Sequence, residues 1–140
     1  MVSTILSRKN RNAITVDPTC SVLDALKIMA NENIGSLVVK ENDKYAGIVT
    51  ERDYSRKVVL KGKNSTETTV AEIMSIDLPV VSPNDSIDHC MEIMSARKIR
   101  HLPVLKENQL IGIVSIGDVV SAVIQAQKDT INHLQNYIAQ

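Results

Sequence analysis

The sequence predicts an α+β fold: two β-α-β-β-α repeats packed with pseudo-two-fold symmetry into one module, followed by a C-terminal helical extension. The first observation is an internal duplication, because each residue n of the first half aligns without a gap with residue n + 65. The second is that both copies place their apolar residues with the same period. The third is size: 140 residues suit one ordinary domain, or two small ones that share a core.

Each copy begins with a short extended segment, at residues 14–16 and 79–81, and a turn that contains proline. A helix follows, for which Ser21 or Ser86 is the expected N-cap. Its apolar residues recur at i, i+3, i+4 and i+7, which predicts one core-facing side. These residues are Val22, Ala25, Leu26 and Met29 in the first copy, and Ile87, Cys90, Met91 and Met94 in the second.

Two strands come next in each copy, at residues 36–40 and 46–50, and at residues 102–105 and 110–115. Polar turns at residues 41–44 and 106–108 join them into hairpins. A second helix then starts at Thr50 or Ser115. We therefore expect repeat 1 at residues 10–63, a linker with a short helix at 64–76, repeat 2 at 77–126, and a C-terminal helical extension at 127–140.

Composition limits the classes of function. The chain has 16 basic and 16 acidic side chains, three Tyr, no Phe and no Trp. This balance argues against a protein that coats nucleic acid or anionic lipid, and the lack of aromatics argues against stacking platforms. The N-terminus has no signal-peptide pattern, and no apolar stretch is long enough to cross a membrane. Cys20 and Cys90 lack a CxxC spacing, which favours reduced thiols in a cytoplasmic protein.

The strongest candidate for chemistry is a motif that occurs at the same place in both copies. Gly-Ile-Val precedes Thr50-x-x-Asp53 in the first copy and Ser115-x-x-Asp118 in the second. One interpretation is an N-terminal capping box, in which the hydroxyl and the carboxylate satisfy the first N–H groups of a helix. The other is a nucleotide site, in which the helix start meets phosphate and the carboxylate accepts hydrogen bonds from ribose.

Here the chain resembles the CBS-domain family, and its tandem arrangement resembles the Bateman module. The resemblance covers about residues 10–126 and depends on Asp17-Pro18, on residues 99–104 (Ile-Arg-His-Leu-Pro-Val) and on the repeated Gly-Ile-Val-Thr/Ser motif. Two further stretches, residues 50–57 and 115–120, are similar to small stand-alone CBS-pair proteins.

The resemblance implies that an adenosine-containing ligand (AMP, ADP, ATP, NAD or S-adenosylmethionine) binds in clefts between the repeats. Asp53 and Asp118 would then hold ribose, and Thr50 and Ser115 would lie on the phosphate side. Arg100 and His101 would reach phosphates, whereas the matching Gly35 and Ser36 carry no charge. The preferred cleft therefore uses Ser115, Asp118, Arg100 and His101, with Ile14 and Ile113 as its adenine wall and Gly35 close by.

We therefore expect a non-enzymatic regulatory module with no metal, no membrane segment, an unidentified regulated partner protein and a homodimeric state. Two alternatives stay open: a structural dimerisation scaffold with vestigial clefts, and a nucleic-acid-binding protein that uses the basic run from Arg52 to Lys63. For that run, a solvated helix face is the simplest interpretation. The neutral composition counts against nucleic acid.

Overall fold

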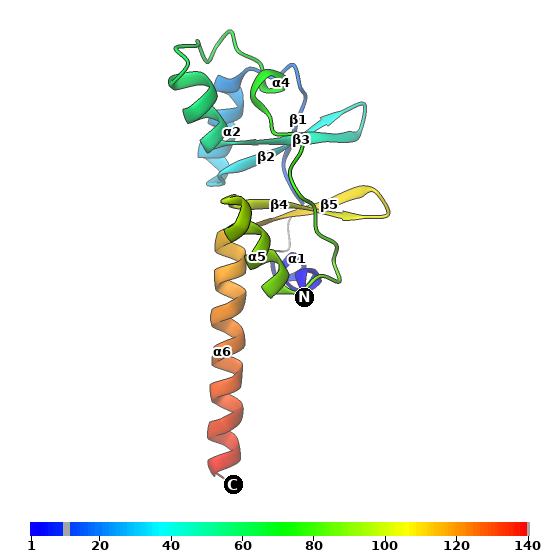
Figure 1. Ribbon diagram of the computed structural model, residues 1–140, viewed down its shortest axis with the longest axis vertical. Helices are drawn as coiled ribbons and strands as arrows, with labels where there is room; N and C mark the ends of the chain where they lie inside the picture. The colour runs from blue at the N-terminus through cyan, green and yellow to red at the C-terminus, as the bar shows by residue number, and fades with distance from the viewer. Residues whose placement is uncertain (10–11, 140) are drawn as a thin grey trace. The chain divides into compact units, whose positions relative to one another are not determined.

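A computed structural model describes residues 1–9 and 12–139 (Figure 1). The chain divides into two compact units. The repeat-1 unit contains Asn12–Leu78 together with Glu107–Ile111. The repeat-2 unit contains the N-terminal helix, Pro79–Lys106 and the chain from Gly112 onward. The expected α+β composition and the two successive repeats are confirmed.

The repeat-1 unit carries a three-stranded sheet in the order β1-β2-β3. Strand β1 runs parallel to β2, and β2 runs antiparallel to β3, with Val38 opposite Ile48. The elements are β1 (Thr15–Val16), α2 (Val22–Glu32), β2 (Ser36–Glu41), β3 (Lys44–Thr50), α3 (Glu51–Tyr54), the π-helical turn η1 (Ser55–Val59) and α4 (Val70–Ile73). The core lies between the sheet and these helices, with Leu37, Val39 and Val49 fully buried.

The other elements are α1 (Val2–Lys9), α5 (Ile87–Arg97), β4 (His101–Lys106), β5 (Gln109–Ser115) and α6 (Ile116–Ala139). They form the repeat-2 unit, except that the first residues of β5, up to Ile111, are assigned to the repeat-1 unit. Strands β4 and β5 pair with each other. The expected first strand of this copy is reduced to a single parallel bridge between Val81 and Val104. In the first copy Val38 N donates to the Ile14 carbonyl, but the residue that aligns with Val38 is Pro103, which has no N–H group to donate.

Local signals predicted the turns and helix starts well. Ser21 Oγ accepts from Asp24 N at 3.1 Å, and Ser86 Oγ accepts from His89 N at 3.0 Å, so both expected N-caps are confirmed. Both hairpins turn on two residues with positive φ: Asn42 and Asp43 in the first copy, and Glu107 and Asn108 in the second. Turns of this kind match the twist of the strands that they join.

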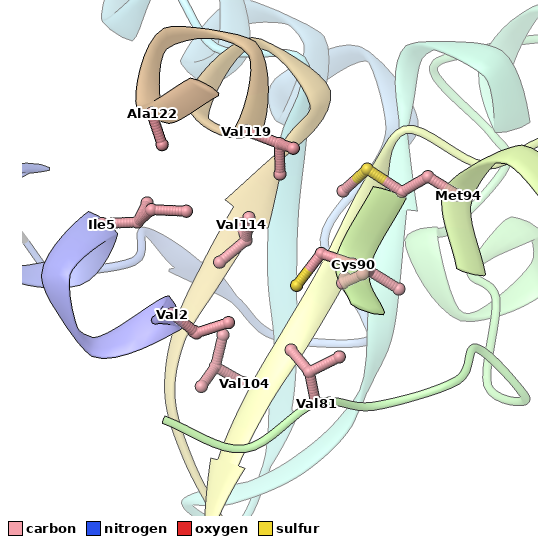
Figure 2. Close-up of a cluster of buried hydrophobic side chains, with 10 residues drawn as sticks. Val2, Ile5, Val81, Cys90, Met94, Val104, Val114, Val119 and Ala122 are labelled. Atoms are coloured by element: carbon pink, nitrogen blue, oxygen red, sulfur yellow. The ribbon is translucent and has the colours of Figure 1, made fainter. Parts of the chain in front are cut away.

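The repeat-2 core shows what the sequence analysis missed. Helix α1 places Val2 and Ile5 against Val81, Val104 and the rest of this cluster (Figure 2). The offset of the duplication aligns Ile5 with Val70, so α1 occupies in the repeat-2 unit the role that α4 plays in the repeat-1 unit.

One core assignment was wrong. Met91 was expected to be buried, but its side chain is 42% exposed. The same helix buries Cys90 and Met94, so its buried side is narrower than the spacing of its apolar residues predicted. In the described part of the chain, no helix has the length and apolar character needed to span a bilayer.

Candidate functional site

The repeated motif forms the same capping box in both units. Thr50 N donates to Asp53 Oδ2 at 2.9 Å, and Asp53 N donates back to Thr50 Oγ1 at 3.1 Å. Ser115 N donates to Asp118 Oδ2 at 2.9 Å, and Asp118 N donates to Ser115 Oγ at 3.1 Å. Each carboxylate is thereby fixed at the point where a strand ends and a helix begins. The observed hydrogen bonds therefore confirm the capping interpretation. They do not decide whether the carboxylate oxygens of Asp53 and Asp118 also bind a ligand.

A lysine in the π-helical turn η1, which follows α3 directly, neutralises the first of these carboxylates. Lys57 Nζ lies 3.0 Å from Asp53 Oδ1 at i,i+4 spacing, and it also donates to the carbonyl oxygen of Ile73 at 2.9 Å. Ser75 Oγ donates to the same Asp53 oxygen at 3.3 Å. The Asp53 side chain is only 8% exposed, so its carboxylate is engaged and largely closed to solvent.

A lysine from a distant segment neutralises the second carboxylate. Lys9 Nζ, at the end of α1, donates to Asp118 Oδ2 and to the carbonyl oxygen of Ile113, both at 2.9 Å. Burial opposes ionisation of Asp118, but the hydrogen bonds from Ser115 and Lys9 and the charge of Lys9 together lower the pKa of this carboxyl below its ordinary value. The Asp118 side chain is 21% exposed, so a solute can reach it more readily than Asp53.

The other predicted residues of this site meet at the same end of the repeat-2 unit. Ile116 N, in the first turn of α6, donates to the carbonyl oxygen of Arg100 at 2.8 Å, so the start of β4 lies beside the start of α6. Arg100 is exposed, and His101 is partly buried at the first position of β4. Ile113 is almost fully buried on β5. Within this unit the structure thus brings Arg100, His101, Ile113, Ser115 and Asp118 to one edge.

The remaining predicted residues belong to the repeat-1 unit. Glu51 N donates to the carbonyl oxygen of Gly35 at 3.2 Å, and Ser36 pairs with Thr50 across β2 and β3. Ile14 accepts from Val38 N at 3.0 Å beside the same sheet. Gly35, Ser36, Thr50 and Asp53 therefore gather at one edge of this sheet. The expected sharing of Ile14 and Gly35 with the site around Asp118 stays a prediction.

Sequence reasoning missed the two lysines as partners of the motif. Lys57 could have been found, because a lysine four residues after an aspartate on a helix is a standard ion pair. Lys9 gave no such signal, since it precedes the first repeat and aligns with Met74 under the duplication. The pairing of Lys57 also removes one cation from the basic run considered for nucleic acid.

The two cysteines differ in their burial. Cys90 is fully buried, as expected of a small core residue, and Cys20 is partly exposed. Burial raises the pKa of both thiols, which makes them poor nucleophiles at neutral pH. Across residues 1–9 and 12–139, no group of three or more His, Cys, Asp or Glu side chains is placed to hold a metal ion.

Comparison with known proteins places these features in a family. The chain is 39% identical over 148 residues to the mitochondrial CBS domain-containing protein CBSX3 of Arabidopsis thaliana, covering 98% of this chain and 71% of the relative. A solved structure of a protein with CBS domains from Burkholderia ambifaria shares 47% identity at a TM-score of 0.85, covering 90% of this chain and 95% of that one.

A third relative is an enzyme, but the match covers only part of it. The inosine-5'-monophosphate dehydrogenase of Thermoplasma acidophilum is 31% identical over 112 residues, which are 79% of this chain and 22% of the dehydrogenase. The CBS-domain family model itself matches residues 2–59 and 70–125. With two matched segments that include both capping-box motifs, the chain belongs to the CBS-domain family.

Proposed function

We propose that the chain is a regulatory module that binds an adenosine-containing ligand at the start of α6. Pairs of CBS domains are generally regulatory, ligand-binding modules and are typically non-catalytic. The observation that carries the proposal is Asp118, an oriented and partly accessible carboxylate at a helix start. Arg100 lies beside the same helix start. AMP, ADP, ATP, NAD and S-adenosylmethionine share the adenosine group that such a site would bind.

The chemistry of these side chains suits the two ends of that group. A carboxylate accepts hydrogen bonds, so Asp118 would take the ribose hydroxyls. Phosphate oxygens favour cations and helix N-termini, which Arg100, His101 and the first turn of α6 offer, with Ser115 on the same side. Lys9 already lies within hydrogen-bond distance of Asp118 and would share it with the ribose. The chain lacks Phe and Trp, so the base would contact aliphatic side chains, among them the small exposed part of Ile113.

The matching edge of the repeat-1 unit is the weaker candidate. Asp53 is nearly buried, and Lys57 and Ser75 both contact its Oδ1 atom. A ligand at Thr50, Asp53 and Ser36 would have to compete with these internal contacts. We therefore propose that the site around Asp118 fills first, with Ile14 and Gly35 as further contributors that stay to be tested.

The test compares ligand binding by Asp118→Asn with binding by a matched control. Asp85 is suitable because its Oδ2 accepts from Ser82 N at 2.8 Å, the same three-residue capping geometry outside the proposed site. Calorimetry and thermal shift with each of the five ligands should show binding to wild type and Asp85→Asn. Binding to Asp118→Asn should be at least tenfold weaker. A ligand at 100 times its dissociation constant stabilises the folded state by about 2.7 kcal/mol.

Two results would contradict the proposal: no shift with any of the five ligands, or equal loss of binding in both variants. A bound ligand acts on a partner protein only if its affinity differs between two states of the module. The regulated partner and the cytoplasmic location stay predictions.

The dimerisation scaffold remains the second candidate, and a specific observation favours it. Helix α6 exposes a series of large apolar side chains, which a second chain could cover. The nucleic-acid alternative loses support from the structure. Lys57 is bound to Asp53 and Ile73, and Arg52 also has an internal interaction.

A further inference from the structure

Helix α6 extends far beyond the core that its first turns help to build. Val119 and Ala122 are buried against the repeat-2 core, where α6 packs on α5 and α1. Every residue from 126 to 139 is exposed, and Figure 1 shows this part of α6 running past α5. An exposed helix of this length gains little stability from propensity alone and commonly needs a packing partner.

Five of the exposed apolar residues of α6 follow a heptad pattern, and Ile116 and Tyr137 lie beside it. Val120, Ile124, Ile131, Leu134 and Ile138 are between 47% and 81% exposed. Together with Gln127 they recur at alternating steps of four and three residues, and we call these six residues the α6 seam. Ile124, Ile131 and Ile138 take the a positions, and Val120, Gln127 and Leu134 take the d positions. All three a positions are β-branched, which together with Leu at d favours a parallel two-stranded coiled coil; Leu134 is the one Leu among the d positions.

We propose that the α6 seam pairs with the α6 seam of a second copy of this chain, in parallel orientation and in register. The flanking positions agree with this, because Val123, Thr130, Lys128 and Gln135 would bring no like charges together. The opposite side of the helix is polar: Gln125 Nε2 donates to Asp129 Oδ1 at 3.0 Å there. The inference is independent of the ligand proposed above.

Gln127 determines the orientation. In a parallel pair, each d residue faces its own counterpart, so the two Gln127 amides meet and can donate to and accept from each other. In an antiparallel pair, a residues face d residues, and each Gln127 amide would be buried against isoleucine without a partner. An unpaired buried amide is costly, so the parallel pair is favoured.

A groove beside α6 continues this surface. Its volume is about 540 Å³, and it lies between the first turn of α5 and the middle of α6. The lining residues are Ser86, Ile87, Asp88, Val123, Ala126, Gln127, Thr130 and Ile131. Because Gln127 and Ile131 belong to both the groove and the α6 seam, side chains of the second copy have space beside them.

The first experiment measures the oligomeric state of the full chain by sedimentation over a range of concentrations. Wild type should dimerise, and the double variant Ile124→Asp/Ile131→Asp should raise the dissociation constant by a factor of about 100 or more, because it buries charge in the seam. The matched control Asn132→Asp/Asn136→Asp adds the same charges on the opposite side and should dimerise like wild type. Circular dichroism confirms that both variants stay folded.

The second experiment tests orientation with Leu134→Cys in a Cys20→Ser background. In a parallel pair the two cysteines at this d position face each other and form an intermolecular disulfide on mild oxidation. Wild type that stays monomeric at every concentration would overturn the proposal. So would a dimer that survives the double aspartate variant, which would locate the interface elsewhere. A dimer whose Leu134→Cys form fails to cross-link would overturn the parallel orientation.

Discussion

Two glycines that the duplication aligns should respond differently to the same substitution. Gly47 on β3 and Gly112 on β5 have the same motif around them, and a Cβ atom at either position would lie 2.7 Å from its nearest neighbour. The neighbours differ in kind. At Gly47 it is the backbone carbonyl oxygen of Ser75, and at Gly112 it is the Cδ2 atom of Leu6. A carbonyl oxygen can move only with its backbone, whereas a leucine methyl can rotate away.

The expected cost of Gly47→Ala follows from what Ser75 is bonded to. Ser75 N donates to the Ile48 carbonyl at 2.8 Å, and Ile48 N donates to the Ser75 carbonyl at 3.0 Å. Relief of the clash moves this segment and weakens both hydrogen bonds, each of which contributes about 1 kcal/mol. The added methyl group also overpacks this contact at a similar cost. The expected loss in the free energy of unfolding is therefore about 2–3 kcal/mol. For a chain of this length, that is a fall in Tm of about 10 °C.

Gly112→Ala should be nearly neutral by the same reasoning. A new rotamer of Leu6, which is only partly buried, costs about 1 kcal/mol at most. Alanine has less backbone entropy than glycine in the unfolded chain, and this difference stabilises the folded state by about 0.5–1 kcal/mol. We therefore expect a Tm within about 3 °C of wild type. Urea denaturation and calorimetry of both variants measure the difference, and equal losses at the two positions would refute this account of the contacts.

Three further predictions concern single groups. Lys9→Met removes the cation beside Asp118 and should cost about 1 kcal/mol in urea denaturation, because the pair is partly exposed to solvent; an unchanged midpoint would contradict the ion pair. Because the folded pKa of Asp118 is lowered, its contribution to stability is present above the unfolded value of about 3.9 and is lost as pH falls through the lower folded pKa. Acid titration should therefore unfold Lys9→Met at a higher pH than wild type. Cys90, which is fully buried with a raised pKa, should react with iodoacetamide far more slowly than the partly exposed Cys20, as mass spectrometry would show.

Much of the fold could be predicted because its signals are local. The caps at Ser21 and Ser86, the turns at residues 42–43 and 107–108, and the helix starts after Thr50 and Ser115 each depend on a few neighbouring residues. Helix α1 could not be predicted in this way. Its apolar residues are explained only by the tertiary core that they enter, where α1 has the role that α4 has in the repeat-1 unit.

The candidate site could likewise be predicted only where its signals are local in the sequence. The motif predicted where Asp53 and Asp118 lie along the chain, because strand end, hydroxyl and carboxylate are adjacent in sequence. It could not predict which cations lie beside them. Met91 illustrates the converse error, since its position has the spacing of a core residue but its side chain is exposed.

The two copies therefore differ in what neutralises their shared carboxylate. Asp53 is paired with Lys57 four residues later, and Ser75 and the Ile73 carbonyl, both within the repeat-1 unit, hold the same pair. Asp118 depends on Lys9, and Lys9 reaches it only while Val2 and Ile5 hold α1 in the repeat-2 core. Loss of α1 would therefore remove core contacts and the partner of Asp118 together, while the capping box of Asp53 stayed intact. Duplication preserved the hydrogen-bonded motif in both copies, but in the second copy a distant N-terminal segment supplies the charge that balances it.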